Sequence, residues 1–98
     1  MQEFLVYKEK EKYKVDSNKK DINNFSEKLI NLCSLYKVEG EKENIPIMNI
    51  SISKFPKSIS IDTDNMDIKK DTKKFHKELV DIIKESFFKK EKNIDKER

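Results

Sequence analysis

The sequence contains one histidine and one cysteine, side chains that often act as a general base, a nucleophile or a metal ligand. His76 falls at the margin of an apolar helical pattern, and nothing nearby in the sequence orients it as a catalytic partner would. Cys33 falls on the apolar face of another helical pattern, between Leu29 and Tyr36. We therefore interpret His76 as a boundary residue that covers the edge of the core, and Cys33 as a small buried hydrophobic residue.

Three aspartates, Asp62, Asp64 and Asp67, resemble a fragment of a calcium-binding loop. That loop also needs a central glycine and a distal glutamate, and Ile68 stands where a late ligand would be expected. A chain with one glycine cannot build a glycine-rich phosphate loop, and one cysteine cannot form an intrachain disulfide or a multi-cysteine metal site. We therefore interpret the aspartates as helix-capping residues, and we predict no catalytic, cofactor-binding or metal-binding site and no enzymatic activity.

The most specific candidate for ligand binding is a row of lysines in the C-terminal helical pattern. Residues placed about 100° apart around a helix axis form a basic row, with Phe87 projecting nearby, and an acidic row roughly opposite the core face. The basic row consists of Lys69, Lys70, Lys73, Lys77 and Lys84, and the acidic row of Asp67, Asp71, Glu78, Asp81 and Glu85. Lysines beside an aromatic ring can hold a phosphate backbone and stack a base, or contact an acidic partner. The alternative is a solvated face on which lysine stems cover the core edge and pair with the acidic row.

A second candidate surface lies on the outward face of the first helical pattern. It is polar but weakly charged, with an aliphatic residue at its margin, and consists of Asn23, Asn24, Glu27, Asn31 and Leu35. Such a surface suits protein contact, because the centres of protein interfaces are depleted in charge. The alternative is that the asparagines reflect codon bias alone.

The length and composition of the chain limit the fold that can position these residues. A chain of 98 residues allows one domain and one core. Only 35% of the residues are hydrophobic and 42% are charged, so the core must be thin, nearer two layers than three. The net charge is only +3, and low hydrophobicity leads to disorder mainly when the net charge is high. We therefore expect one folded domain over residues 1–90 and a disordered, solvated charged tail over residues 91–98.

Two pairs of strands are predicted from apolar and aromatic runs that alternate with polar residues. Residues 3–7 and 13–15 are typical of a hairpin with its turn near Glu9 and Lys10, and one long edge strand is the alternative. Residues 45–53 and 58–61 predict a second hairpin, with its turn at Phe55, Pro56 and Lys57.

Two helices are predicted from apolar residues at spacings of three and four. The first would be capped by Asp21 and stop near Gly40, and the second would run from a cap at Asp67 to about Lys90. The first core face consists of Ile22, Phe25, Leu29, Leu32, Cys33 and Tyr36, and the second of Ile68, Phe75, Leu79, Ile82 and Ile83. The order ββαββα predicts an α+β two-layer sandwich, in which a small antiparallel sheet of three or four strands carries both helices on one face.

Composition also bears on the partner. Base-reading proteins favour arginine for its bidentate contacts, and only Arg98 is an arginine, so the lysines fit phosphate contact or an AT-rich genome better than sequence reading. No stretch approaches the ~18 apolar residues of a membrane span or forms a signal peptide, so we expect a cytoplasmic chain without membrane contact. A homodimer is possible if the outer sheet face, with Leu5 and Tyr7, is apolar.

These patterns favour a small non-enzymatic binding protein that acts by occupying a macromolecular partner, with a protein as the expected partner. Alanine-free chains of this size from AT-rich genomes are often phage or mobile-element accessories, so an inhibitor of a host nuclease, defence system or toxin is one expectation. The alternative is a nucleic-acid-binding module that contacts the phosphate backbone through the lysines.

Overall fold

A computed structural model describes residues 1–88 of the chain. The predicted charged tail, residues 91–98, lies outside the described residues. The elements follow one another as β1 (Gln2–Glu9), β2 (Lys12–Ser17), α1 (Phe25–Tyr36), β3 (Glu39–Gly40), β4 (Met48–Lys54), β5 (Lys57–Asp62), β6 (Met66–Asp67) and α2 (Thr72–Phe87).

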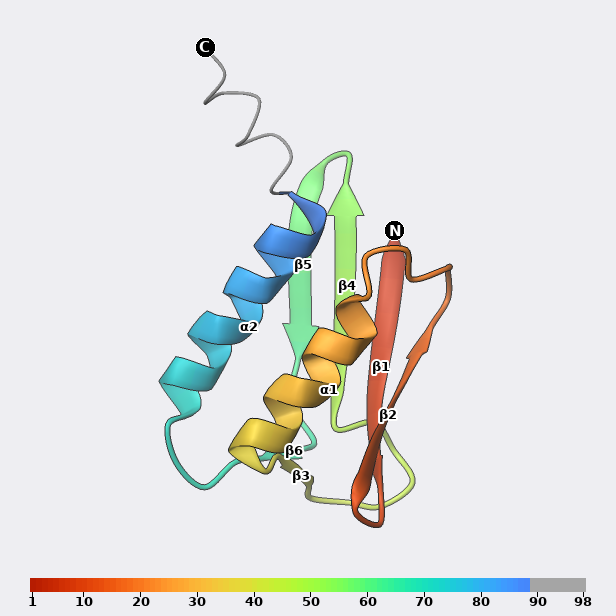
Figure 1. Cartoon of the computed structure of the whole chain (residues 1–98). Coiled ribbons are helices and arrows are strands. Elements are labelled where there is room, and N and C mark those ends of the chain that lie inside the picture. The colour runs from red at the N-terminus through yellow and green to blue at the C-terminus, as the bar shows by residue number, and fades with distance from the viewer. Residues whose placement is uncertain (89–98) are drawn as a thin grey trace.

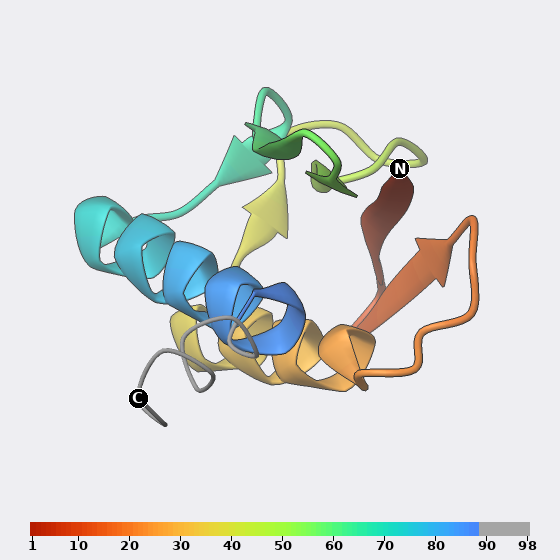
Figure 2. The same ribbon diagram turned by 90° about the horizontal axis from the view of Figure 1, so that it is seen from above.

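Four strands form an antiparallel sheet in the order β2-β1-β4-β5. Both helices cover the same face of this sheet, with α2 on the side of β5 and α1 on the side of β1 (Figure 1). The view from above in Figure 2 shows the helices together on one side of the strands. The predicted α+β two-layer sandwich with the order ββαββα is therefore confirmed. The short strands β3 and β6, which were not predicted, pair with each other in a separate two-stranded sheet.

The first hairpin is confirmed, and the single long edge strand is wrong. Glu9 pairs with Lys12, so the turn consists of Lys10 and Glu11, and Lys10 adopts a positive φ of 60°. The second hairpin is also confirmed, because Lys54 pairs with Lys57 around a turn at Phe55 and Pro56.

The core lies between the sheet and the helices. Phe4 and Val6 of β1 point to the helix face and are fully buried, whereas Leu5 and Tyr7 lie on the opposite face and are only half-buried. Among the fully buried helical residues of this core are Phe25, Leu29, Phe75, Leu79 and Ile83. Burial of each such side chain contributes roughly 1.5–3 kcal/mol, which is why these elements hold together.

Helix α1 begins later than its apolar pattern predicted. The carboxylate of Asp21 accepts hydrogen bonds from the backbone N–H groups of Phe25 (3.1 Å) and Ser26 (2.8 Å), so its capping role is confirmed. Ile22 was expected on the core face, but it is 76% exposed. It precedes the first helical residue, so the helical period does not apply to it.

The end of α1 is set by Lys37 and not by the glycine at position 40. Lys37 adopts the left-handed conformation (φ 52°), and the N–H groups of Lys37 and Val38 bond to the carbonyls of Ser34 and Cys33. Gly40 lies in β3, where an added Cβ would come within 3.1 Å of the Asn65 side-chain nitrogen. The glycine therefore permits close packing of a loop.

Helix α2 begins at Thr72, so the expected cap at Asp67 is wrong. The backbone of Asp67 pairs with Glu39 in the short β3–β6 sheet and is not available to start a helix. The helix ends at Phe87, short of the expected Lys90, which lies outside the described residues. Neither helix of the described part of the chain is long and apolar enough to cross a membrane.

Candidate functional site

The predicted row of five lysines is shorter in the structure. Lys69 and Lys70 precede α2, and the Lys69 ammonium lies 3.5 Å from the Asp67 carboxylate. Lys73, Lys77 and Lys84, hereafter the lysine row, are all exposed on α2. Lys77 also lies 3.5 Å from Asp81, one helical turn further on, so part of the row's charge is paired within α2.

Contacts made by α2 determine where the lysine row lies. Leu79 is buried against the core, and Glu78 and Val80 lie about 100° to either side of it. Glu78 accepts a hydrogen bond of 2.8 Å from the Tyr36 hydroxyl of α1. Val80 therefore lies on the side of α2 away from α1. The lysine row follows the Val80 side of the helix, roughly 120–160° from Leu79.

Phe87, which was predicted to contact nucleic acid or an acidic partner, is half-buried and packs against aromatic rings of the core. Its ring centroid lies 5.4 Å from that of Phe25 and 6.0 Å from that of Phe4, and it packs against the core. The expected stacking role for Phe87 stays a prediction, for a ring that already contacts two others. A side chain expected near the lysines therefore meets an aromatic ring of β1 and one of α1.

The outward face of α1 contains most of the predicted protein-contact residues. Asn24, Glu27, Asn31 and Leu35 are exposed, and Asn23 is half-buried in the turn before the helix. The Leu35 side chain is 72% exposed, although leucine is normally buried. The structure therefore presents one aliphatic side chain among weakly charged neighbours.

The side chains that could take part in chemistry, Cys33, Tyr36 and His76, are buried or half-buried in the fold. Cys33 is fully buried, and burial raises the pKa of its thiol to about 12. Burial and the hydrogen bond to Glu78 raise the pKa of Tyr36 to about 12. His76 is half-buried with its ring beside that of Phe75, as its place at the margin of the pattern predicted.

The aspartates of the supposed calcium fragment form a turn. The Asp62 carboxylate accepts the backbone N–H of Asp64 at 3.0 Å, and Asp67 is paired in β6. Within residues 1–88, no group of three or more His, Cys, Asp and Glu residues is placed to hold a metal ion.

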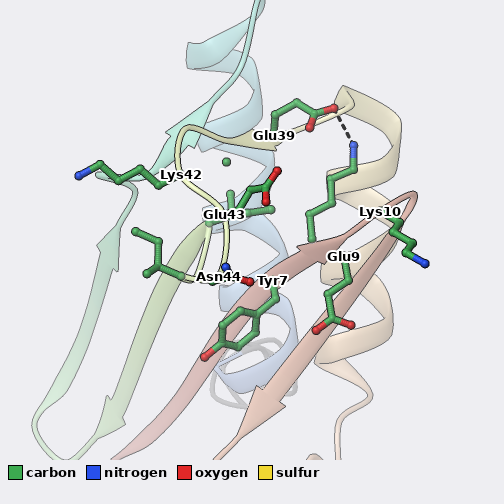
Figure 3. Close-up of a pocket in the computed structure, with 11 residues that line it drawn as sticks. Tyr7, Glu9, Lys10, Glu39, Lys42, Glu43 and Asn44 are labelled. Atoms are coloured by element: carbon green, nitrogen blue, oxygen red, sulfur yellow. Dashed lines mark hydrogen bonds and ion pairs between the residues drawn. The ribbon is translucent and has the colours of Figure 1, made fainter.

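A cavity of about 610 Å³ lies between the end of β1 and the loop that follows β3. Figure 3 shows Tyr7 and Glu9 on β1, with Glu43 and Asn44 on the loop opposite. Three lysines and three glutamates line it, and Lys8 pairs with Glu39 at 2.6 Å. Because these charges balance, the lining favours neither a cation nor an anion.

Asn65 holds this loop, and sequence reasoning missed it. Its side chain donates to the carbonyls of Lys42 and Pro46, each at 3.1 Å, and accepts the Lys42 N–H at 2.8 Å. The only signal in the sequence was its place in a segment rich in capping residues. That segment gave no indication of a partner 23 positions away.

The outer face of the sheet and the tip of the second hairpin are two further exposed surfaces. The outer sheet face carries Leu5 and Tyr7 beside Asn49, Ser51 and Ser53 of β4, so it is polar and does not meet the condition set for a homodimer. The ring of Phe55, at the tip of the second hairpin, is 92% exposed. The predicted turn at this position was the only signal for that exposure.

Comparisons of the chain with protein-family models, curated proteins and solved structures found no match.

Proposed function

We propose that this chain is a small binding protein that acts by occupying a macromolecular partner, and that the partner is a protein held by the outward face of α1. The observation that carries the proposal is the 72% exposure of Leu35 among Asn24, Glu27 and Asn31. Large side chains at the centre of an interface provide most of its binding energy, and charge there is costly to desolvate. Leu35 provides such a large exposed side chain, and the uncharged Asn31 lies one helical turn from it.

The positions of the reactive side chains support binding over chemistry. The Cys33 thiol is buried, with a pKa raised to about 12, and Tyr36 is hydrogen-bonded to Glu78. Both residues link parts of the fold, whereas Leu35 contributes little burial within the chain. A protein that blocks the working surface of a nuclease, toxin or defence protein needs only such a contact surface, and we propose inhibition of this kind.

Nucleic acid is the second candidate partner, favoured by the alignment of the lysine row along one side of α2. The half-buried ring of Phe87 packs against Phe25 and Phe4, so less of it is available to stack a base. Binding through phosphates alone would appear as affinity for any oligonucleotide that falls steeply as salt rises. Reversing the charge of Lys73, Lys77 and Lys84 together would abolish it.

The test is a quantitative pulldown from a lysate of the source organism, with the tagged chain and two charge variants. Leu35→Glu replaces the exposed aliphatic side chain of the proposed surface with a carboxylate and should reduce recovery of a stoichiometric protein at least about tenfold. Thr72→Glu adds the same charge at the exposed start of α2, where a helix tolerates it, and should leave recovery unchanged.

Circular dichroism should first establish that both variants are folded. A chain that recovers no stoichiometric protein, or equal recovery by the two variants, would overturn the proposal. Recovery of oligonucleotide that depends on the lysine row would favour the second candidate.

A further inference from the structure

Strand β5 leaves one backbone edge of the main sheet unpaired by any described element. It is the last strand in the order β2-β1-β4-β5, and it pairs with β4 alone. The pairing runs without a bulge from Lys54 opposite Lys57 to Asn49 opposite Asp62. Alternate N–H and C=O groups of β5 therefore point outward in a regular row, which is the geometry that an added strand requires.

The two edges of the sheet differ in how they are protected. On β2, Lys12, Lys14 and Asp16 are exposed along the strand, and charges of this kind discourage pairing with another chain. The middle of β5 has the sequence Ser-Ile-Ser-Ile, with charges only at its ends, Lys57 and Asp62. Edge β5 thus lacks the central charges that protect edge β2.

The inward side of β5 is incompletely covered. Ile50 and Ile52 of the neighbouring strand β4 are buried, with exposures of 0% and 3%. Their partners Ile61 and Ile59 on β5 are only half-buried, although they face the same helix layer. One more strand beside β5 would cover both isoleucines.

The lysine row supplies a charge preference at this edge. Helix α2 lies on the side of β5 (Figure 1), Val80 is half-buried on the side of α2 away from α1, and Lys73 and Lys84 extend from the same side of the helix. An incoming strand would therefore meet aliphatic surface next to β5 and positive charge beyond it.

We propose that β5 accepts an extended acidic segment of a partner protein as a fifth strand of the main sheet. Aliphatic side chains of that segment cover Ile59 and Ile61, and its acidic side chains reach the lysine row. A second copy of this chain is disfavoured, because two copies paired through β5 would bring their lysine rows together. This inference rests on the proposed function in taking the partner to be a protein.

The test uses a synthetic peptide, Glu-Thr-Ile-Thr-Ile-Thr-Glu with blocked ends, added to ¹⁵N-labelled full-length protein. One face of this extended peptide presents two isoleucines flanked by glutamates. At peptide concentrations up to about 1 mM, we expect shifts of amide resonances concentrated in residues 57–62. A peptide with lysine in place of glutamate should bind at least about tenfold more weakly.

Two controls separate strand addition from general attraction. The same peptide N-methylated at alternate residues keeps its side chains but loses backbone donors, and it should cause no shifts. In the protein, Ser60→Glu adds a like charge in the middle of β5 and should weaken binding of the acidic peptide, whereas Ser34→Glu on α1 should not.

The proposal is overturned if no β5 amide shifts at about 1 mM peptide, if the lysine peptide binds equally well, or if the shifts lie on α1. Concentration-dependent β5 shifts without peptide would also overturn it, in favour of self-association. If the peptide fails while Leu35→Glu still abolishes partner recovery, only this inference fails and the proposed function stands.

Discussion

Cys33 occupies a position where packing determines the chemistry of the side chain. Its side chain belongs to the buried core cluster and has no exposed surface. Because a thiolate is poorly stabilised without water, burial raises the pKa of the thiol from 9.0 to about 12. A nucleophilic cysteine needs the opposite environment.

Native Cys33 should therefore resist alkylation by iodoacetamide at pH 8. A pKa raised by about three units lowers the thiolate fraction about a thousandfold, and the reagent also lacks access. The measurement is the alkylation rate by mass spectrometry, in buffer and in denaturing urea. In Cys33→Ser carrying Ser34→Cys, the new thiol is exposed on α1 and should react rapidly without urea. Equal alkylation rates in buffer for the parent protein and for this double variant would contradict the assignment of Cys33 to the core.

Lys37 bears the conformational strain at the end of α1. Its φ of 52° lies in the left-handed region, which costs a side chain with a Cβ roughly 1–2 kcal/mol and costs glycine little. The only glycine, Gly40, serves instead to let Asn65 and the Lys42 carbonyl approach β3.

Replacement of Lys37 by glycine should raise the free energy of unfolding by about 1 kcal/mol, since it removes this strain. Urea denaturation monitored by circular dichroism measures the change. Ser34→Gly, within the exposed side of the last turn, should instead lower stability by about 1 kcal/mol. A destabilised Lys37→Gly variant would show that the left-handed turn is not the feature that ends α1.

The two helices are tied together by the hydrogen bond from Tyr36 to Glu78 and by the contact between the Tyr36 and Phe75 rings at 5.3 Å. Burial and this hydrogen bond raise the pKa of Tyr36 from 10.0 to about 12. Folding thus favours the protonated phenol. The resulting stabilisation is present below about pH 10 and is lost as the pH rises toward 12.

Tyr36→Phe should accordingly be less stable than the parent protein at pH 7, and the difference should shrink between pH 10 and 12. Cys33 also has a raised pKa, but it contributes equally to both proteins, so the comparison isolates Tyr36. Glu78→Gln keeps an acceptor without the charge and should show an intermediate alkaline loss. Unfolding free energies from urea titrations across this range provide the measurement. A constant difference at all pH values would contradict the role of the hydroxyl.

Three aromatic rings from distant parts of the chain join the layers of the molecule. Phe4 of β1, Phe25 of α1 and Phe87 of α2 have ring centroids 4.8 to 6.0 Å apart. Edge-to-face contacts of this kind add to the burial of apolar area. A chain with a thin core depends strongly on such a cluster, because a domain of this size is stable by only about 5–15 kcal/mol.

Phe87→Ala should therefore lower the free energy of unfolding by about 2–4 kcal/mol. Phe55→Ala is the matched control, since its ring is 92% exposed and its loss should change stability by less than about 0.5 kcal/mol. Thermal and urea denaturation of both variants compare these values. If Phe87→Ala has the same free energy of unfolding as the parent protein, the contribution of Phe87 to the core is contradicted and base stacking by its ring is favoured.

Local periodicity was sufficient to predict the four strands of the main sheet, both hairpins, the two helices and the apolar face of each element. Side-chain direction repeats every two residues in a strand and every 3.6 in a helix, so the buried face can be read from neighbouring residues. The two-layer order followed, because two amphipathic helices and one half-apolar sheet face have only one simple way to cover each other.

Only tertiary structure determined where those periods stop and which surfaces meet. Pairing of residues 66–67 with residues 39–40 delays the start of α2 and removes Lys69 and Lys70 from the lysine row. The last turn of α2 places Phe87 against Phe4 and Phe25, and the contact between Glu78 and Tyr36 places the lysine row on the side of α2 away from α1. These outcomes depend on contacts between residues far apart in the chain, which a local pattern does not encode. The exposed leucine of α1 was predictable because it depends on helical period alone, whereas the open edge of β5 was not.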